Sequence, residues 1–264
     1  MRRGVGVRRR SPRQRTLRPV RTTVVIPTYN EIDNIDRVCR EVRRVVPGAR
    51  ILVVDDGSPD GTADRAEQLG RELGSIDVLR RTTKDGLGRA YLAGLRRAID
   101  DGAEVCVQMD ADLSHDPEAL PALIANIEHG ADLAIGSRYV PGGRTINWSR
   151  RRRWLSRWGN RYAAGVLGLA INDATAGYRA FRSSALVRME FEKVTAEGYG
   201  FQIEMAHRMV RAGGRVVEFP IVFPDRVEGV SKMSGSIVRE AFGLVLRLWV
   251  LDFWGRRHRR AQGG

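Results

Sequence analysis

The chain has 264 residues, of which 42% are hydrophobic, and it carries a formal net charge of +14. This length and composition suffice for one large globular domain with a sizeable core, which excludes a fully disordered chain. Nine arginines and no acid lie in residues 1–21, and four more arginines lie within 256–260, so the excess charge is concentrated at the two ends.

The terminal segments are therefore predicted to be a disordered basic arm (1–21) and a basic tail (256–264), attached to a nearly neutral body. Cys39 and Cys106 show neither a pairing pattern nor a metal-type spacing, which predicts reduced thiols in the core. The first hydrophobic run, Val24–Ile26, is too short for the core of a signal peptide, so we expect the protein to stay on the cytoplasmic side.

Strand and helix patterns alternate through the first half of the chain. Each strand is apolar and each following helix amphipathic, with Asn30 placed to cap the first helix. Four such units in succession predict an α/β fold with a mostly parallel central sheet flanked by helices. The expected strands are Thr22–Ile26, Arg50–Val54, Ile76–Leu79 and Val105–Met109, and the expected helices end near Val46, follow Thr62 and start near Asp85.

A helix to about His129 and a strand over Asp132–Arg138 follow, and beyond them the alternation ends. Residues 150–170 are predicted to form a helix in which Trp154, Trp158 and Tyr162 share one face. Aromatic residues among arginines are typical of a membrane-interface helix, and a stripe packed in the core is the alternative.

The last third is predicted to contain a strand within Asp173–Arg182, a helix over Phe201–Ala212 and an edge strand, Arg215–Pro220. The final element, within 236–255, is apolar but interrupted by charges, so it does not supply the roughly 20 uncharged residues of a membrane span. We expect an amphipathic helix that lies at a membrane interface or docks on a partner, with packing on the protein's own core as the alternative.

Two carboxylates, Asp110 and Asp112, come at the end of the apolar run that begins at Val105. In an extended chain residues i and i+2 point the same way, so both acids can face one hard cation. Mg²⁺ is commonly held by one or two carboxylates and substrate phosphates. A turn after a strand explains the same pair without a metal.

Seven motifs in order give the chain a resemblance to the inverting family 2 glycosyltransferases, which have the Rossmann-like GT-A fold, and among them to polyprenol or dolichol phosphate mannosyltransferases. The resemblance spans residues 22–234. It departs from the family at Ser114, often glutamine, and at Gly200, often basic. The motifs are Pro27–Glu31, Asp55–Thr62, Asp110–His115, Gly136–Tyr139, Thr175–Ala180, Gly198–Glu204 and the pair Arg226 and Lys232.

The resemblance implies that a GT-A catalytic domain covers 22–235 and that GDP-mannose is the donor. By the same resemblance Mg²⁺ or Mn²⁺ lies on Asp110 and Asp112, and Asp112, Arg138, Arg226 and Lys232 are catalytic. The acceptor implied is a polyprenyl or dolichyl phosphate, with its phosphate on Arg138, Arg152 and Ser156. The donor-binding residues implied are Pro27, Tyr29, Glu31, Val54, Asp56, Asp110, Ala111, Asp112, Arg226 and Lys232.

A phosphate oxygen is already anionic at neutral pH, so we expect positioning and charge stabilisation, rather than a strong base, to produce a β-linked mannosyl phosphate lipid. Transfer of glucose from UDP-glucose is the first alternative. A nucleic-acid-binding module is the second, although no aromatic residue precedes Tyr29 to stack on bases. Anionic lipids explain the basic arm equally well. We expect a peripheral protein on the cytoplasmic face of the membrane, held there by interfacial helices or by an integral membrane anchoring protein, without nucleic acid as a partner.

Overall fold

The computed structural model describes residues 20–225 and 242–252. The strands are β1 (Thr22–Thr28), β2 (Arg50–Asp55), β3 (Ile76–Arg80), β4 (Val105–Gln108), β5 (Leu133–Ser137), β6 (Arg144–Ile146), β7 (Arg179–Arg182), β8 (Val216–Pro220) and β9 (Val222–Pro224). The helices are α1 (Ile32–Val45), α2 (Thr62–Leu73), α3 (Leu87–Asp100), α4 (Leu120–Glu128), α5 (Arg150–Leu167), α6 (Ser183–Arg188) and α7 (Gly198–Arg211). Two 3-10 turns, η1 (Pro117–Ala119) and η2 (Phe191–Lys193), and a further helix over 242–252 complete the described elements.

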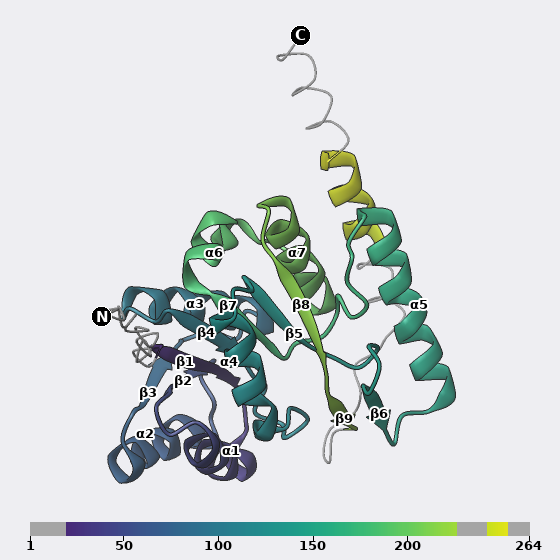
Figure 1. Cartoon of the computed structure of the whole chain (residues 1–264). Helices are drawn as coiled ribbons and strands as arrows, with labels where there is room; N and C mark the ends of the chain where they lie inside the picture. Colours follow the sequence, from purple (N-terminus) through teal and green to yellow (C-terminus); the bar gives the residue numbers. More distant parts are fainter. Residues whose placement is uncertain (1–19, 226–241, 253–264) are drawn as a thin grey trace, which may run out of the picture.

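Seven strands form one sheet in the order β3-β2-β1-β4-β7-β5-β8 (Figure 1). Strand β7 runs antiparallel to both β4 and β5, and the other pairs in this sheet are parallel. The predicted α/β fold with a mostly parallel sheet is therefore confirmed. Because β7 is reversed, the loop before it lies at the edge where β1, β2 and β4 end, which is where open α/β sheets bind ligands.

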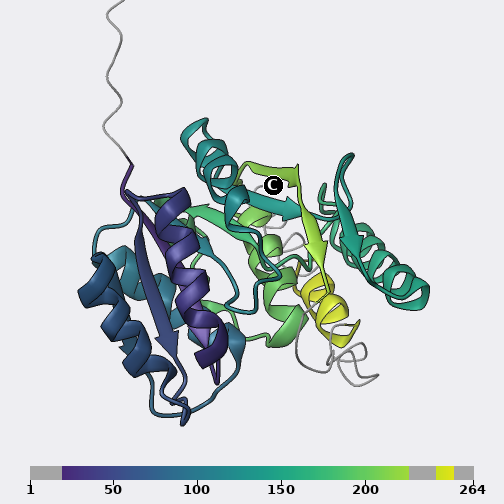
Figure 2. The ribbon, with the colours of Figure 1, turned by 90° about the horizontal axis from the view of Figure 1, so that it is seen from below.

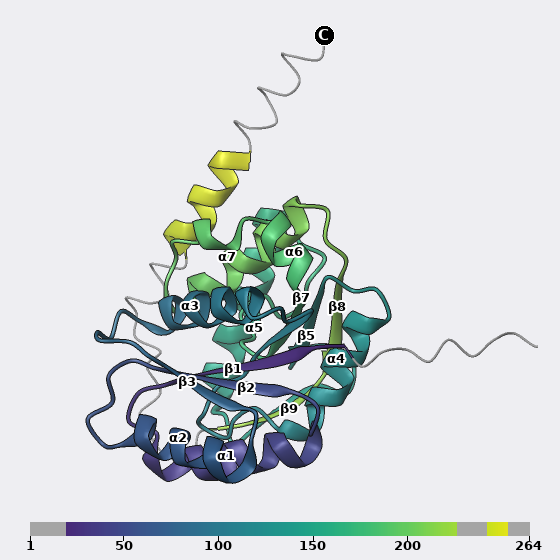
Figure 3. The same cartoon turned by 90° about the vertical axis from the view of Figure 1, so that its left-hand side faces the viewer.

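Helices cover both faces of this sheet, and Figure 3 shows α1 and α2 on one side and α3 and α7 on the other. Successive strand residues point to opposite faces, so Val24 packs with α1, α2 and α4 while Val25 packs with α3 and α7. Helix α5 lies at the opposite end of the molecule from α2 (Figure 2). The edge at which β1, β2 and β4 end therefore lies between two parts of the molecule. One part contains β1 to β4, and the other contains α5 and α7.

Helix α3 packs unusually close to the sheet because of one glycine. A Cβ added to Gly94 would lie 2.3 Å from Cγ1 of Val25 and 2.8 Å from Cγ2 of Val54. Neither distance is compatible with an ordinary contact, so a side chain at position 94 would push α3 away from β1 and β2. This close packing fixes the position of Tyr91, one turn earlier on α3.

The start of α1 differs from the prediction. Asn30 has a φ of 58° and precedes the N-cap residue Glu31, so its side chain does not cap the helix. Its main-chain N–H instead donates a hydrogen bond to Oγ of Ser58, at 3.0 Å. Asn30, which follows the end of β1, therefore binds the β2–α2 loop and does not cap α1.

The helix over 242–252 packs one face on the protein's own core, as the alternative prediction held. Val245 and Leu248 are buried, whereas Leu246, Trp249 and Leu251 are exposed. Asp252, the last described residue of the chain, accepts from Nη2 of Arg211 at 2.5 Å. Arg239 and Glu240, two of the charges that interrupt this element, lie outside the described residues. Among the described helices, none is both long enough and apolar enough to cross a bilayer.

Candidate active site

The β2–α2 loop is organised by Asp55, which is 2% exposed. Its Oδ1 accepts from Oγ1 of Thr28 (2.9 Å) and Oγ of Ser58 (2.6 Å), and its Oδ2 accepts from the main-chain N–H of Gly57 (3.1 Å) and Ser58 (2.8 Å). These bonds occupy both carboxylate oxygens. Asp55 therefore shapes the loop, and the neighbouring Asp56 is the acid left to face a ligand.

Four side chains at the ends of β1, β2 and β3 form a polar edge suited to a nucleoside. Nη1 of Arg81 donates to Oδ1 of Asp56 at 2.6 Å, and Nζ of Lys84 lies 3.4 Å from the ring centroid of Tyr29. Burial raises the pKa of Asp56, while Arg81 acts in the opposite direction. The carboxylate can accept from the N–H or hydroxyl groups of a nucleoside, and the cations suit its phosphates.

Three of the predicted donor residues lie in the interior. Val54 is fully buried and faces α3, Pro27 is buried in β1, and Ala111 is 3% exposed. Their side chains are packed away from solvent, so a contact with a donor would fall to their main-chain atoms. Glu31 is half-buried, and its main-chain N–H donates to Oγ1 of Thr62 at 3.0 Å.

Asp110 is held from two sides. The hydroxyl of Tyr91 donates to its Oδ1 at 2.6 Å, and its main-chain N–H donates to Nδ1 of His115 at 2.9 Å. Since Nδ1 accepts, the proton of the neutral ring sits on Nε2, 4.0 Å from Oδ2 of Asp110. Burial, and then the charge of Asp110, raises the pKa of Tyr91 well above its usual range, so Tyr91 remains a donor.

Asp112 is fixed by Ser114, whose main-chain N–H and Oγ donate to its Oδ1 at 3.1 and 2.5 Å. Ser114 is thus occupied with positioning Asp112 at the place where the family often has glutamine. Within residues 20–225 and 242–252, no three His, Cys, Asp or Glu side chains form a metal-binding group. Two carboxylates nevertheless fit Mg²⁺ or Mn²⁺, because substrate phosphates and water normally complete the oxygen shell of such ions.

The loop before β7 joins this acid pair to Arg138. Asp173 accepts three hydrogen bonds from Arg138, and Oγ1 of Thr175 accepts another from Nη2 at 2.9 Å. Two residues further on, Gly177 lies beside Asp110: a Cβ built on it would be 3.8 Å from Oδ2 of Asp110 and 3.7 Å from Nε2 of Gln202. A single short segment therefore contacts both sides of the site.

Arg179, at the start of β7, fixes the loop that precedes this strand. Its guanidinium is fully buried and donates to the carbonyl oxygens of Ala174, Ala176 and Gln202 at 2.7 to 2.8 Å. Burial lowers its pKa to about 9. Because the guanidinium donates its hydrogen bonds to main-chain oxygens, it stabilises the loop that contains Asp173 and Gly177.

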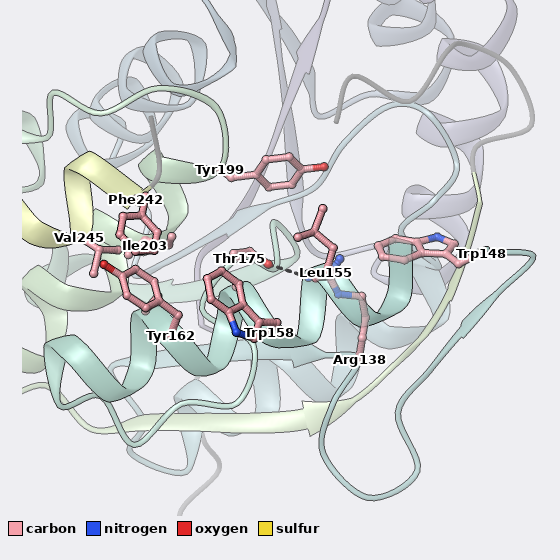
Figure 4. Close-up of a pocket in the computed structure, with 13 residues that line it drawn as sticks. Arg138, Trp148, Leu155, Trp158, Tyr162, Thr175, Tyr199, Ile203, Phe242 and Val245 are labelled. Carbon is pink, nitrogen blue, oxygen red and sulfur yellow. Dashed lines mark hydrogen bonds between the residues drawn. The ribbon is translucent and has the colours of Figure 1, made fainter. Parts of the chain in front are cut away.

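An amphipathic pocket opens beside Arg138 (Figure 4). Arg138 and Trp148 lie at one end of it, and Tyr162, Phe242 and Val245 lie at the other. The rings of Tyr162 and Phe242 stack with centroids 4.1 Å apart, which joins α5 to the helix over 242–252. The pocket thus offers a charged end and an apolar end to a ligand that has both.

The three predicted acceptor residues meet near Trp148 and Tyr139. The guanidinium of Arg152 lies 3.9 Å from the ring centroid of Trp148, and that of Arg138 lies 5.4 Å from it. Ser156 lines the pocket and accepts a hydrogen bond from the hydroxyl of Tyr139 at 2.7 Å. Arg152 also donates to Asp225 at 2.6 Å, so its position depends on the segment that leads to residue 226.

Arg226 and Lys232 lie outside the described residues. The structure adds residues for which the sequence predicted no role. They are Arg81 and Lys84 on the polar edge, Tyr91 and His115 beside Asp110, and Asp173 beside Arg138. The motif Asp110–His115 contains His115, and Asp173 lies two residues before the motif Thr175–Ala180. Their pairings required the three-dimensional arrangement.

Comparisons with known proteins identify the family of this chain. Residues 23–189 match the family described as glycosyl transferase family 2. The undecaprenyl-phosphate mannosyltransferase of Micrococcus luteus is 48% identical over 235 residues, covering 89% of this chain and 96% of that protein. The polyprenol monophosphomannose synthase of Mycolicibacterium smegmatis is 48% identical over 252 residues, covering 94% of this chain and 93% of that protein.

Among solved structures, glucosyl-3-phosphoglycerate synthase from Mycobacterium tuberculosis, in complex with Mn²⁺, uridine diphosphate and glucosyl-3-phosphoglycerate, superposes with a TM-score of 0.64. The two chains are 20% identical, and the match covers 87% of this chain and 80% of that one, which establishes the fold. Fold and site together define a glycosyltransferase of GT-A fold. Within that class the chain belongs to glycosyl transferase family 2, so the resemblance predicted from the motifs is confirmed.

Proposed function

We propose that this protein transfers mannose from GDP-mannose to a polyprenyl phosphate and releases GDP and a β-mannosyl phosphoryl polyprenol. The names of the two relatives at 48% identity support the sugar and the lipid acceptor. The observation that carries the proposal is the pocket with Arg138 at one end and an apolar wall at the other. That pairing suits a phosphate attached to a prenyl chain.

The donor is assigned to the edge formed by the ends of β1, β2 and β4. Tyr29, Glu31 and Asp56 would bind the nucleoside, and Asp110 and Asp112 would hold Mg²⁺ or Mn²⁺. Such an ion, when bound, supplies a Lewis acid that neutralises charge on a leaving diphosphate. Tyr91 and Ser114 hold the two carboxylates in place, as residues behind metal ligands commonly do. Arg226 and Lys232 are assigned to the same leaving group.

The acceptor phosphate is assigned to Arg138, Arg152 and Ser156. Arg138 uses Nε and Nη2 on its neighbours, and its Nη1 has no hydrogen-bond partner among the described residues, which leaves that nitrogen for a phosphate oxygen. Because the attacking phosphate oxygen is already an anion, the residues need only orient it towards the anomeric carbon. In-line attack inverts the α-linked sugar of the donor.

Peripheral attachment at the cytoplasmic face of a membrane completes the proposal. Trp154 is 65% exposed on α5, and Trp249 and Leu251 are exposed on the helix over 242–252. Exposed tryptophans next to arginines suit the headgroup region of a bilayer. The same apolar surface would also serve an integral membrane anchoring protein.

The test is an incubation of the purified protein with polyprenyl phosphate and either radiolabelled GDP-mannose or radiolabelled UDP-glucose. We expect label in the lipid phase from GDP-mannose alone, and none when polyprenol without phosphate replaces the acceptor. The one-bond C–H coupling at the anomeric carbon of the product then distinguishes the β from the α linkage. If label entered the lipid phase from UDP-glucose alone, the assignment of mannose would be wrong and the protein would be a glucosyltransferase.

A further inference from the structure

A second cleft lies against α5, beside the acceptor pocket, and its mainly polar lining includes two arginines. It offers about 690 Å³ of open space. Tyr139 belongs to this cleft, while its hydroxyl bonds to Ser156 of the acceptor pocket at 2.7 Å, so the two spaces are neighbours. Its lining includes Tyr139, Arg157, Arg161, Ala164, Leu169 and Ile171, with Asn172 at the rim.

The two arginines of this Arg157/Arg161 cleft carry uncompensated charge. Neither forms an ion pair or a hydrogen bond within the described part of the chain, and Arg157 only lies over the ring of Tyr139, at 5.6 Å from its centroid. By contrast, Arg40 on α1 and Arg96 on α3 are both paired with carboxylates. Unpaired guanidinium groups one helical turn apart are suited to the oxygens of one phosphate.

The acids around the cleft do not supply the missing partner. Helix α5 contains no Asp or Glu. Glu218 adjoins the rim residue Asn172, and its carboxylate accepts from N and Nδ2 of Asn172 and from the main-chain N–H of Asp173, at 2.7 to 2.9 Å. Its oxygens are therefore engaged in holding the 172–173 turn.

We propose that the Arg157/Arg161 cleft binds the phosphate headgroup of an anionic membrane lipid, at a site separate from the polyprenyl phosphate pocket. The arginines would bind the phosphate, and Ala164, which is partly exposed beside the largely buried Leu169 and Ile171, would contact the glycerol. Trp154 and Trp158, exposed on the same helix, would enter the headgroup region beside it. This inference rests on the membrane-surface part of the proposed function, and it assigns that contact to one cleft.

The experiment compares the full chain with the double variant Arg157→Gln/Arg161→Gln. The matched control is Arg37→Gln/Arg71→Gln, which removes two exposed and unpaired arginines from α1 and α2. Sedimentation with phosphatidylcholine vesicles, with and without phosphatidylglycerol, measures lipid binding. We expect the cleft variant to lose about thirtyfold in affinity for the phosphatidylglycerol vesicles, the loss expected for two basic residues at an anionic surface. The control should keep its affinity.

Equal losses in both double variants would show unspecific charge attraction and overturn the proposal, as would no loss in the cleft variant. Soluble dihexanoyl phosphatidic acid and inorganic phosphate, titrated while vesicle binding is followed, separate the possible sources of the phosphate. Competition by the short lipid at much lower concentration supports a lipid site, and equal competition by inorganic phosphate overturns it. Mannosyl transfer in detergent should proceed at the same rate in all three proteins. The lipid-binding hypothesis and the proposed reaction are therefore tested by separate measurements, and either can be contradicted without the other.

Discussion

The carboxylate of Asp173 holds Arg138 by three hydrogen bonds, from the main-chain N–H at 2.9 Å and from Nε and Nη2 at 2.8 and 2.6 Å. Both residues are buried. Burial lowers the pKa of the guanidinium, but the charge of Asp173 and its hydrogen bonds with Arg138 act in the opposite direction, and the net effect is a raised pKa. Arg138 is therefore a fixed cation whose direction is set by the loop before β7.

Replacing Asp173 by asparagine should cost about 3–5 kcal/mol of stability, because it leaves a buried cation without its counter-charge. We also expect the substitution to raise the KM for polyprenyl phosphate more than the KM for the donor, because Arg138 loses its orientation. Thermal unfolding and initial rates measure the two effects. Asp100→Asn breaks an exposed pair with Arg96 and should cost less than about 1 kcal/mol. Equal stability of the two variants would contradict the assigned role of Asp173.

Asp112→Asn should reduce transfer by about 100-fold or more, a loss typical of removing one stabilising group from a transition state. The variant should still fold, because asparagine keeps an oxygen for Ser114 to bind. Manganese binding, followed by electron paramagnetic resonance, should weaken in parallel. Glu128→Gln, on the exposed end of α4, is the matched control and should keep both properties. Wild-type activity of the Asp112 variant with Mg²⁺ present would remove the cation from the mechanism.

Gly177→Ala tests how closely the two sides of the site are packed. The added methyl group would lie 3.5 Å from Cε1 of His115 and 3.8 Å from Oδ2 of Asp110, which are ordinary contacts, so the melting temperature should change little. The methyl nevertheless occupies space beside Asp110, and we expect kcat/KM to fall about tenfold or more. Gly165→Ala, which meets nothing within 4 Å on α5, should leave activity unchanged and stabilise the helix slightly.

The sheet and the order of its elements could be predicted because their patterns are local: apolar runs of strand length alternate with amphipathic helices. The acid pair at the end of β4 was predicted for the same reason. The pairings of Tyr91 with Asp110 and of Asp173 with Arg138 could not be predicted, since they join segments 19 and 35 residues apart. The orientation of β7 was also hidden, because a four-residue strand carries no sign of its direction.

A pH dependence should come from the contact between α7 and the helix over 242–252. Nε2 of His207 donates to Oδ2 of Asp252 at 3.1 Å, and burial lowers the pKa of His207 even though Asp252 acts against that shift. The unfolded chain then binds a proton more readily than the folded one, so stability should decline as pH falls below about 6.5, the ordinary value for histidine. Melting temperatures from pH 7.5 to 5.5 should fall more steeply for the wild type than for His207→Gln; parallel curves would exclude His207 as the cause.

The reversed direction of β7 limits how this enzyme can be re-engineered. Because β7 enters the sheet from the edge where β1, β2 and β4 end, residues 173–177 reach both parts of the candidate site, with Asp173 fixing Arg138 and Gly177 adjoining Asp110. Under the proposed function this one segment would serve both substrates. An insertion in that segment would disturb recognition of the sugar nucleotide together with that of the lipid. A variant intended to change lipid preference alone should instead exchange α5 for the corresponding helix of a relative. Helix α5 lines the pocket beside Arg138 and does not contribute to the polar edge at the ends of β1, β2 and β3.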